Sequence, residues 1–330
     1  MSGLLFALAM NLQQLRYLHT IAGEGFNISR AAQALHTSQP GISKQIRLLE
    51  REAGVDILIR RGNRVVGVTE PGEAILAVAR RMLQDAETVR RIGEDHSRKS
   101  KGRMVVATTH IHARYVLREI IRDFIRRHPA VRLVLRQGSP SQVAQLVAAG
   151  EADIGVSSEP PGEPMPDLIS LPCFKLERSV VAPLGHPLLK EKRLTLKAIA
   201  KYPIVTYDAS YVGGAAVARA FEKAGTEPNI VLTAIDADVI KAYVELGLGI
   251  AILPTAAYEP GRDRALRALD ARRLFEPTVT RVEIRRDSYL RSYMYDFIAA
   301  LSPGWDREAV DRMTRARSPR RATTPAGPRR

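Results

Sequence analysis

The chain has 330 residues, of which 45% are hydrophobic, and this length suits about two globular domains. Its 50 lysines and arginines against 35 acidic residues give a formal net charge of +15, which favours polyanionic partners such as DNA, RNA or a membrane surface. The single cysteine, Cys173, excludes an internal disulfide framework and predicts a reducing compartment, the cytoplasm. The apolar stretch 1–9 is too short to span a bilayer; we expect the true start at Met10, and residues 1–9 to be either a disordered extension or no part of the protein.

The first predicted elements are three helices. Apolar residues at helical spacing predict one over 12–22, and Asn27 or Ser29 can cap a second, short helix. The third begins at Ser38, with Pro40 in its first turn, where a missing N–H costs little. Two short helices joined by a tight turn, the second amphipathic and basic outward, indicate a helix-turn-helix.

The third helix begins with small, polar residues, as a helix that enters the major groove of DNA should. A glutamine can make two hydrogen bonds to adenine, proline can pack on a thymine methyl group, and lysine and arginine can contact phosphates or bases. For a helix of this kind alone, an ordinary solvated face is the alternative. We expect DNA contacts from Ser38, Gln39, Pro40, Ser43, Lys44 and Arg47.

The next stretch, "ILIRRGNRVVGVTEPG", places a Gly-Asn turn between two short apolar and basic runs, which predicts a β-hairpin. A hairpin after a helix-turn-helix is a wing. Arg60, Arg61 and Arg64 would then face the minor groove and flanking phosphates, or solvent alone.

A long helix is predicted from a cap at Thr69, and its apolar residues recur at intervals of four and three. This spacing predicts a two-stranded coiled coil that pairs two heads, although a helix packed inside its own domain is the alternative. The dimerisation residues would be Ile75, Ala79, Met82, Ala86 and Val89. The polar, charged segment 94–102 is predicted to be a hinge.

After the hinge, short apolar runs alternate with helical patterns, which predicts βαβ units and parallel sheets. The expected fold class is an α/β effector domain of two Rossmann-like lobes, preceded by an all-α winged helix-turn-helix domain and a linker helix. The run "TRVEIRR" and a helix over 289–301 would return to complete the first sheet. A ligand would bind in the cleft beyond the carboxyl ends of the strands.

Several segments resemble the LysR-type transcriptional regulators, and among these the branch of CysB and Cbl, in order and at suitable spacing. They include "TSQPGISKQIRLLE", "ATTH", "RQGSPSQ", "LPC", "DADVIKAYVELGLGIAI" and "LRSYMYDFI". The resemblance implies a homotetramer that binds promoter DNA, with an effector domain akin to periplasmic binding proteins; RNA polymerase is left open as a partner. The expected domains are a winged helix-turn-helix at 10–68, a linker helix at 69–93, an effector domain at 103–302 (lobe I about 103–172 and 277–302, lobe II about 173–276) and a basic, disordered tail at 303–330.

The resemblance also implies an anion in the cleft, such as sulfate, thiosulfate or O-acetylserine, and regulation of sulfur assimilation. The implied anion-binding positions are Thr109, Ile111, His112, Ser158 and Val212. Ile111 and Val212 stand where that branch has hydroxyl residues, and His112 stands where it has an amide. The site is therefore expected to bind a different ligand, or to bind sulfate more weakly. A protonated His112 could supply a donor and a charge, which would suit a carboxylate or larger anion.

Three other functions remain as alternatives. A LysR-type regulator of another pathway fits the same motifs. A solute-binding protein would lack a DNA-binding head, and an enzyme would need a catalytic set that the sequence does not offer. His110 and His112 have the spacing of two metal ligands, but no carboxylate or cysteine accompanies them, so we expect no metal and no cofactor. Cys173 is expected to be a packed thiol, with a redox sensor as the alternative.

Overall fold

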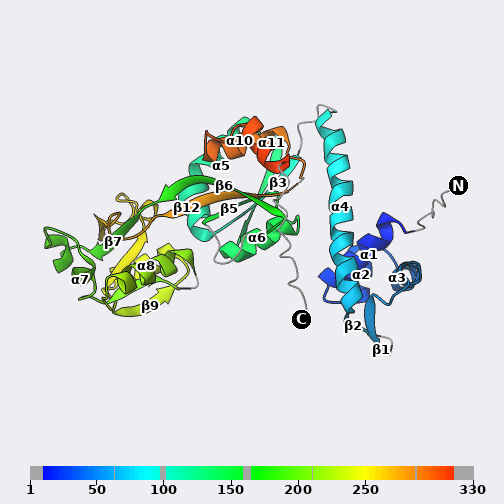
Figure 1. The fold of residues 1–330 in the computed structure, drawn as a ribbon, viewed down its shortest axis with the longest axis horizontal. Helices are drawn as coiled ribbons and strands as arrows, with labels where there is room; N and C mark the ends of the chain where they lie inside the picture. Colours follow the sequence, from blue (N-terminus) through cyan, green and yellow to red (C-terminus); the bar gives the residue numbers. More distant parts are fainter. Residues whose placement is uncertain are drawn as a thin grey trace, which may run out of the picture. The chain divides into compact units, whose positions relative to one another are not determined.

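The computed structural model describes residues 10–62, 64–96, 102–158, 165–209, 211–286 and 288–315. The chain divides into two compact units, Met1–Lys99 and Ser100–Arg330 (Figure 1). The predicted extension at 1–9, most of the hinge and the last part of the tail lie outside the described residues. No helix within the described ranges is long and apolar enough to cross a membrane.

The first unit is the winged helix-turn-helix head with its linker helix, as predicted. Each short helix begins at a side chain that accepts a backbone N–H: Asn11 from Gln14, Asn27 from Arg30, and Ser38 from Gly41. A two-stranded antiparallel hairpin forms the wing. The elements are α1 (Leu12–Gly23), α2 (Ile28–Ala34), α3 (Gln39–Ala53), β1 (Leu58–Arg61), β2 (Arg64–Val68) and α4 (Glu70–His96).

The core of the head holds α4 against the other helices. Leu18, Ile21, Ile42 and Ile46 are buried together, and the first half of α4 adds Ala79 to the same cluster. The predicted cap is present, because the hydroxyl of Thr69 accepts the N–H of Gly72 at 3.0 Å. Gly72 is required there, since a Cβ would lie 2.2 Å from the carbonyl oxygen of Ile57.

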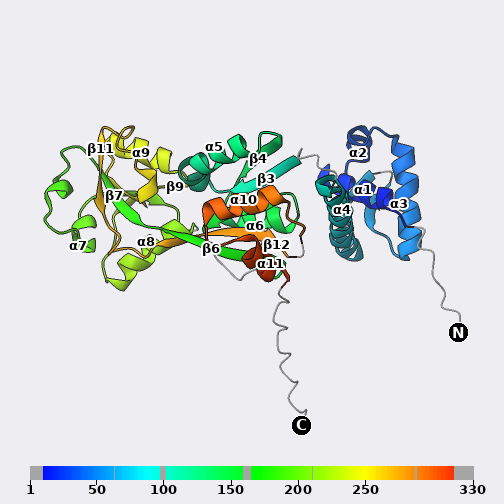
Figure 2. The same ribbon diagram turned by 90° about the horizontal axis from the view of Figure 1, so that it is seen from above.

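Lobe I of the second unit is a five-stranded sheet in the order β4-β3-β5-β12-β6, with helices on both faces. Figures 1 and 2 show α5, α10 and α11 on one face and α6 on the other. Its elements are β3 (Gly102–Thr108), the π-helical turn η1 (His112–Val116), α5 (Leu117–Arg127), β4 (Val131–Gln137), α6 (Pro140–Ala148), β5 (Ile154–Ser158), β6 (Leu168–Leu176), β12 (Thr278–Arg285), α10 (Ser292–Leu301) and α11 (Arg307–Arg315).

Lobe II is a second five-stranded sheet, in the order β11-β7-β10-β8-β9. Val217 and Phe221 of α8 pack on one face, and Ile240 and Val244 of α9 pack in a separate cluster with other residues of the same strands. Its elements are β7 (Arg178–Pro183), η2 (Pro187–Lys190), α7 (Leu196–Ile199), β8 (Ile204–Tyr207), α8 (Val212–Lys223), β9 (Ile230–Ala234), α9 (Ala237–Glu245), β10 (Ile250–Pro254), η3 (Thr255–Ala257) and β11 (Leu266–Asp270).

The expectation of parallel sheets is wrong for part of each lobe. Strands of the βαβ units are parallel, as predicted: β3 with β4 and β5, and β8 with β9 and β10. However, β12 is antiparallel to β5 and β6, and β7 is antiparallel to β10 and β11. The antiparallel strands β7 and β12 carry the chain from one lobe to the other. They are not joined to their neighbours by the helical connection that a parallel pair requires, so they need not be parallel.

Two boundaries also differ from prediction. The first crossing between lobes falls at Glu177, between β6 and β7, a few residues after the predicted change at 172/173. The tail was predicted to be disordered from 303, but α11 forms within it. Val310 of α11 is fully buried in the core of lobe I, and the indole N–H of Trp305 donates to the carbonyl oxygen of Pro172 at 2.7 Å. Tertiary packing stabilises a helix that its polar composition did not suggest.

Candidate functional site

The third helix presents the predicted DNA-contacting residues on its outer face. Ser38, Gln39, Pro40, Lys44 and Arg47 are exposed and Ser43 is half-buried, whereas the opposite face enters the core. The helix therefore has an uncovered polar side beginning at its N-terminus, which is the end that reads base edges in this motif.

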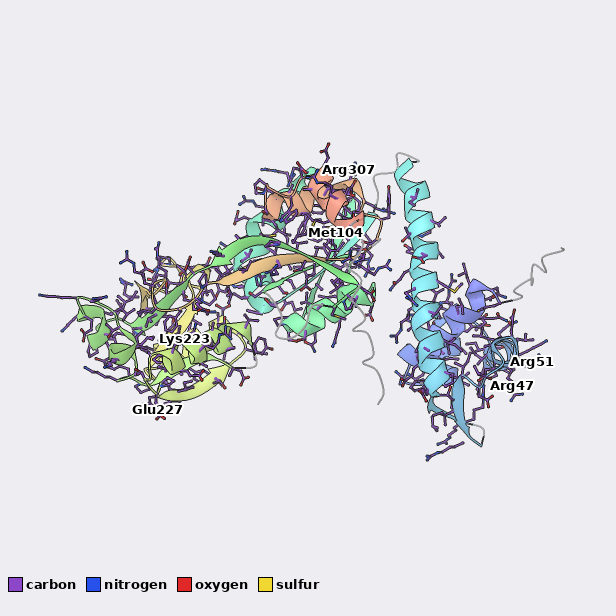
Figure 3. All side chains as sticks on the ribbon, in the orientation of Figure 1. Arg47, Arg51, Met104, Lys223, Glu227 and Arg307 are labelled. Carbon is purple, nitrogen blue, oxygen red and sulfur yellow. The ribbon has the colours of Figure 1, made fainter. Side chains whose placement is uncertain are left out.

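Two further residues join this surface. Arg51 lies one turn beyond Arg47 on α3 (Figure 3), and both line a surface hollow with Lys44 and Pro40. The hydroxyl of Ser29 in α2 donates to Oε1 of Gln39 at 3.1 Å and so orients the glutamine. Helical spacing from Arg47 could have identified Arg51; no sequence pattern indicated the contact of Ser29.

The wing also contributes predicted arginines to the same surface, Arg60 to the first hollow and Arg64 to a second. Arg64 is exposed and lines a second hollow together with Ser29 and Gln39. Arg61 pairs with Arg64 across the end of the hairpin. Two adjacent cations at the end of a wing suit contact with flanking phosphates.

Arg60, also predicted to contact DNA, lines the hollow beside α3 and binds the end of that helix. Its guanidinium binds both carboxylate oxygens of Glu50, at 3.0 and 2.8 Å, and Glu50 also accepts the N–H groups of Ile57 and Leu58 at 3.0 and 3.1 Å. Burial raises the pKa of Glu50, but these hydrogen bonds outweigh it and hold the pKa below its usual value of 4.5. Arg60 thus ties the wing to the end of α3.

The linker helix divides the predicted dimerisation residues into two groups. Ala79 is 1% exposed in the core of the head, and Ile75 packs against that core. Ala86 is half-buried, and Met82 and Val89 are exposed. The large exposed apolar residues of α4 also follow heptad spacing, in a register shifted from that of the predicted dimerisation residues. We call them the α4 stripe: Val78, Met82, Val89 and Ile92.

In the second unit, a cavity of about 310 Å³ lies in the cleft between the lobes. The structure brings Thr109, Ile111, Ser158 and Val212 together in its lining. They lie at or just beyond the carboxyl ends of strands β3, β5 and β8, where ligands bind in α/β sheets.

His112 does not line this cavity. It is fully buried in lobe I, where Nδ1 lies 2.7 Å from the hydroxyl of Thr109 and Nε2 lies 2.9 Å from the hydroxyl of Thr280. Burial lowers its pKa to about 4, so the ring is neutral at physiological pH. The hypothesis that a protonated His112 binds the effector is therefore wrong, and the ring instead positions Thr109.

The cavity contains a residue that the sequence did not reveal. Arg178, the first residue of β7, lines the cavity and is 1% exposed, yet none of its guanidinium nitrogens has a hydrogen-bond partner among the described residues. The hydroxyl of Tyr207 lines the same cavity and likewise lacks a partner in this part of the chain. Unpartnered buried polar groups that face a cavity indicate a ligand site.

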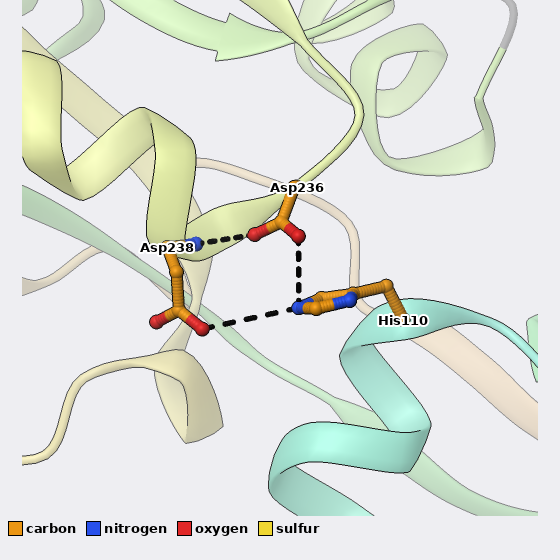
Figure 4. A group of neighbouring side chains, drawn as sticks. All are labelled: His110, Asp236 and Asp238. Carbon is orange, nitrogen blue, oxygen red and sulfur yellow. Dashed lines mark hydrogen bonds and ion pairs between the residues drawn. The ribbon is translucent and has the colours of Figure 1, made fainter.

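At the edge of the cleft, His110 of lobe I faces two carboxylates of lobe II (Figure 4). Its Nε2 lies 2.9 Å from Asp236 Oδ2 and 3.8 Å from Asp238 Oδ2. The three could converge on a metal ion, but Arg114 lies 3.4 Å from Asp238, and Asp236 accepts the N–H of Asp238. Because the carboxylates already have partners, the cluster fits a contact between lobes better than a metal centre.

Cys173 is a partly buried thiol whose Sγ lies 3.5 Å from the carbonyl oxygen of Leu171. Burial raises its pKa to about 11, so the reactive thiolate is scarce at neutral pH. This agrees with a packed thiol and argues against the redox alternative.

A winged head and a two-lobed domain with a cavity in its cleft define a ligand-responsive transcriptional regulator. Residues 12–73 match the bacterial regulatory helix-turn-helix proteins of the lysR family, and residues 97–306 match the LysR substrate binding domain. The chain belongs to the LysR family of transcriptional regulators. Within that family it is a member of the branch that includes CysB and Cbl, as its motifs predicted.

Similar proteins cover nearly the whole chain. The regulator SsuR of Burkholderia cenocepacia is 49% identical over 294 residues, or 89% of this chain and 95% of SsuR. CysB of the same organism is 45% identical over 302 residues, or 92% of this chain and 96% of CysB. The solved cofactor-binding domain of the Cbl regulator superposes with a TM-score of 0.63 at 36% identity, covering 66% of this chain and 96% of that domain. Full-length CbnR bound to its target DNA shares the fold, with a TM-score of 0.62 at 21% identity over 88% of this chain and 99% of CbnR.

Proposed function

We propose that this regulator is a cytoplasmic homotetramer that binds an interrupted palindrome in promoters of sulfur-assimilation genes, and that a small anion in the cleft controls it. The observation that carries the DNA-binding part is the uncovered face of α3, where Gln39, Lys44 and Arg47 are exposed while the other face is buried. We also propose RNA polymerase as a partner of this regulator.

Two heads are needed to read a palindrome. The α4 stripe offers apolar surface at heptad spacing, with Met82 40% and Val89 71% exposed. Pairing two such helices would bury this surface and place two copies of α3 on successive half-sites of one DNA. In this arrangement, closure of the lobes around an anion would change the tetramer and thereby the bend of the DNA.

Sulfur assimilation is proposed because the chain is 45% identical to a CysB and 40% identical to Cbl of Escherichia coli, the branch whose motifs it shares. The effector candidates are sulfate, thiosulfate and O-acetylserine. A second candidate function, control of another pathway, is favoured by Ile111 and Val212, which place apolar side chains in the cavity where the pattern of the branch has hydroxyl groups.

The test is binding of the purified full chain to promoter fragments of its own sulfur-assimilation genes and to scrambled duplexes of equal length. We expect tighter binding to the promoter fragments, and a loss of affinity of roughly 10³ to 10⁵ between 50 and 200 mM salt, for about six to ten neutralised phosphates. Equal binding to promoter and scrambled DNA would refute the proposal. A preference for promoters of unrelated genes would support the second candidate.

A further inference from the structure

The cavity in the cleft contains a buried guanidinium, that of Arg178. Arg178 is 1% exposed, and its Nε, Nη1 and Nη2 atoms make no hydrogen bond within the described ranges. Burial lowers the pKa of Arg178 to about 10, which leaves the guanidinium charged at neutral pH. A buried charge is costly unless it is paired, so natural proteins rarely keep one that does nothing.

The start of α8 adds positive potential beside Arg178, while the carboxylate of Asp236, which also lines the cavity, lies 2.9 Å from His110. A Cβ on Gly213 would lie 3.7 Å from both Nη atoms, so the guanidinium lies beside the first turn of α8. The N-terminal cap of this 12-residue helix, Tyr211, makes no side-chain capping bond. The N-terminus of a helix carries a partial positive charge and free N–H groups, and here it adjoins a guanidinium.

A third group points to the same ligand. Tyr207, at the carboxyl end of β8, is 7% exposed and lines the cavity, and its hydroxyl has no hydrogen-bond partner among the described residues. A cation with a fork of donors, a bare helix end and a free hydroxyl together form a receptor for an oxyanion.

The remaining lining indicates what carries that oxyanion. Ile111, Pro140, Val212 and Ile235 present apolar surface to the cavity, beside polar residues that include Thr109, Ser158 and Gln142. Its volume of about 310 Å³ corresponds to about ten groups the size of a water molecule, which is more than a free tetrahedral oxyanion needs.

We propose that Arg178 is the anion anchor of the cleft, and that the effector is an organic anion: a sulfonate or carboxylate group on a short apolar body. The oxyanion binds Arg178, Tyr207 and the start of α8, and the apolar body lies against Ile111 and Val212. This inference rests on the proposed function, since it names the effector class of the same cleft.

The test uses the full chain with three probes: butane-1-sulfonate, pentanoate and inorganic sulfate. Binding is followed by calorimetry and by the rise in melting temperature, because a ligand of the folded state stabilises it. We expect one or both organic anions to bind more tightly than sulfate, and the stronger of the two identifies the oxyanion. If neither organic anion binds more tightly than sulfate, the proposed effector class is overturned.

Three variants test the anchor. Arg178→Met should weaken organic-anion binding by about 100-fold or more and leave the melting temperature of the free protein unchanged or higher, since an unpaired buried charge is removed. Arg178→Lys should retain weakened binding. Arg219→Met removes the same charge from the exposed face of α8 and should bind as the unaltered chain does.

Two results would overturn the role of Arg178: unchanged anion binding by Arg178→Met, or a lower melting temperature of that variant without ligand, which would show a structural role. Promoter binding without effector separates this inference from the proposed function. Arg178→Met should bind the promoter as the unaltered chain does, because the head is intact. If neither the unaltered chain nor Arg178→Met binds the promoter more tightly than scrambled DNA, the proposed function fails, whatever ligand the cleft binds.

Discussion

The Nε2 atom of His110 lies 2.9 Å from Oδ2 of Asp236, and this contact joins lobe I to lobe II at the edge of the cavity (Figure 4). Both residues line the cavity, so a ligand that enters it meets the contact. This contact helps to hold the two lobes together without belonging to the core of either lobe.

His110→Ala should therefore weaken effector binding. A partly exposed pair of this kind contributes about 0.2–1 kcal/mol, so we expect a loss of affinity of up to about 5-fold by calorimetry. A matched control is His128→Ala, because His128 lies 3.0 Å from Asp296 within lobe I alone. Equal affinities in the two variants would show that the link between the lobes does not assist binding.

Gln39 and Lys44 should affect DNA binding in different ways. Gln39→Ala should reduce the discrimination between the operator and single-base variants by about 1–3 kcal/mol at particular positions, because a bidentate contact to adenine is lost. Lys44→Ala should weaken binding to all duplexes and reduce the salt slope by about one, as expected for a phosphate contact. Fluorescence anisotropy at several salt concentrations measures both.

Lys201→Ala, an equal charge change at an exposed position of the second unit, is the control for Lys44. It should leave the salt slope unchanged. If Gln39→Ala loses affinity equally for operator and random duplex, its side chain does not read bases.

Arg60 should matter for stability more than for DNA contact. Arg60→Ala leaves the carboxylate of Glu50, which is 7% exposed, without its bidentate partner. We expect a loss of about 1–3 kcal/mol in the unfolding free energy of the head, measured by urea titration of the full chain. Arg61→Ala removes the exposed neighbouring arginine and should change this free energy by less than about 0.5 kcal/mol. Equal losses would argue against the Glu50 contact.

His112 should make the effector domain sensitive to acid. The folded protein binds a proton at His112 only near pH 4, whereas the unfolded chain binds one at the ordinary pKa of 6.5. The free energy of unfolding should therefore fall by up to about 3 kcal/mol as the pH falls from about 6.5 to about 4. Above pH 6.5 this contribution to stability is fully present.

His112→Gln should flatten this dependence in urea titrations at several pH values, because an amide can contact Thr109 and Thr280 without titrating. His36→Gln alters an exposed histidine of the head and should leave the slope of the effector domain in place. If the His112 variant keeps the full acid dependence, another group is responsible.

Sequence patterns predicted the head and the cleft well because local rules determine them. The caps at Asn27, Ser38 and Thr69 mark helix starts through contacts that lie within a few residues. Thr109 follows β3 and Ser158 ends β5, and the carboxyl ends of these parallel strands share one edge of the sheet.

Features of the site that the sequence did not reveal depend on contacts made only in the folded chain. His112 is held by Thr280, 168 residues away, and Arg60 binds Glu50 across the turn into the wing. Arg178 belongs to no motif, and only the folded arrangement places its guanidinium beside Gly213. The sequence could not show which polar residues of the cleft have partners, and this difference separates positioning residues from ligand-binding ones.

The α4 stripe is expected to pair two heads. Met82 is 40% exposed on α4 and lies at a heptad position with Val78 and Val89. Burying a methionine against a partner helix contributes about 1.5–3 kcal/mol, so Met82→Glu should raise the dissociation constant of the head-to-head contact by about 10- to 100-fold or more.

Sedimentation velocity over a range of protein concentrations measures this change, and we expect the proposed tetramer to give way to a smaller assembly. Met313→Glu is a matched control, because Met313 is 39% exposed on a helix of the second unit. That variant should remain tetrameric. If the two variants dissociate alike, or if neither does, then α4 does not pair the heads, and two copies of α3 must be aligned on the DNA by another surface.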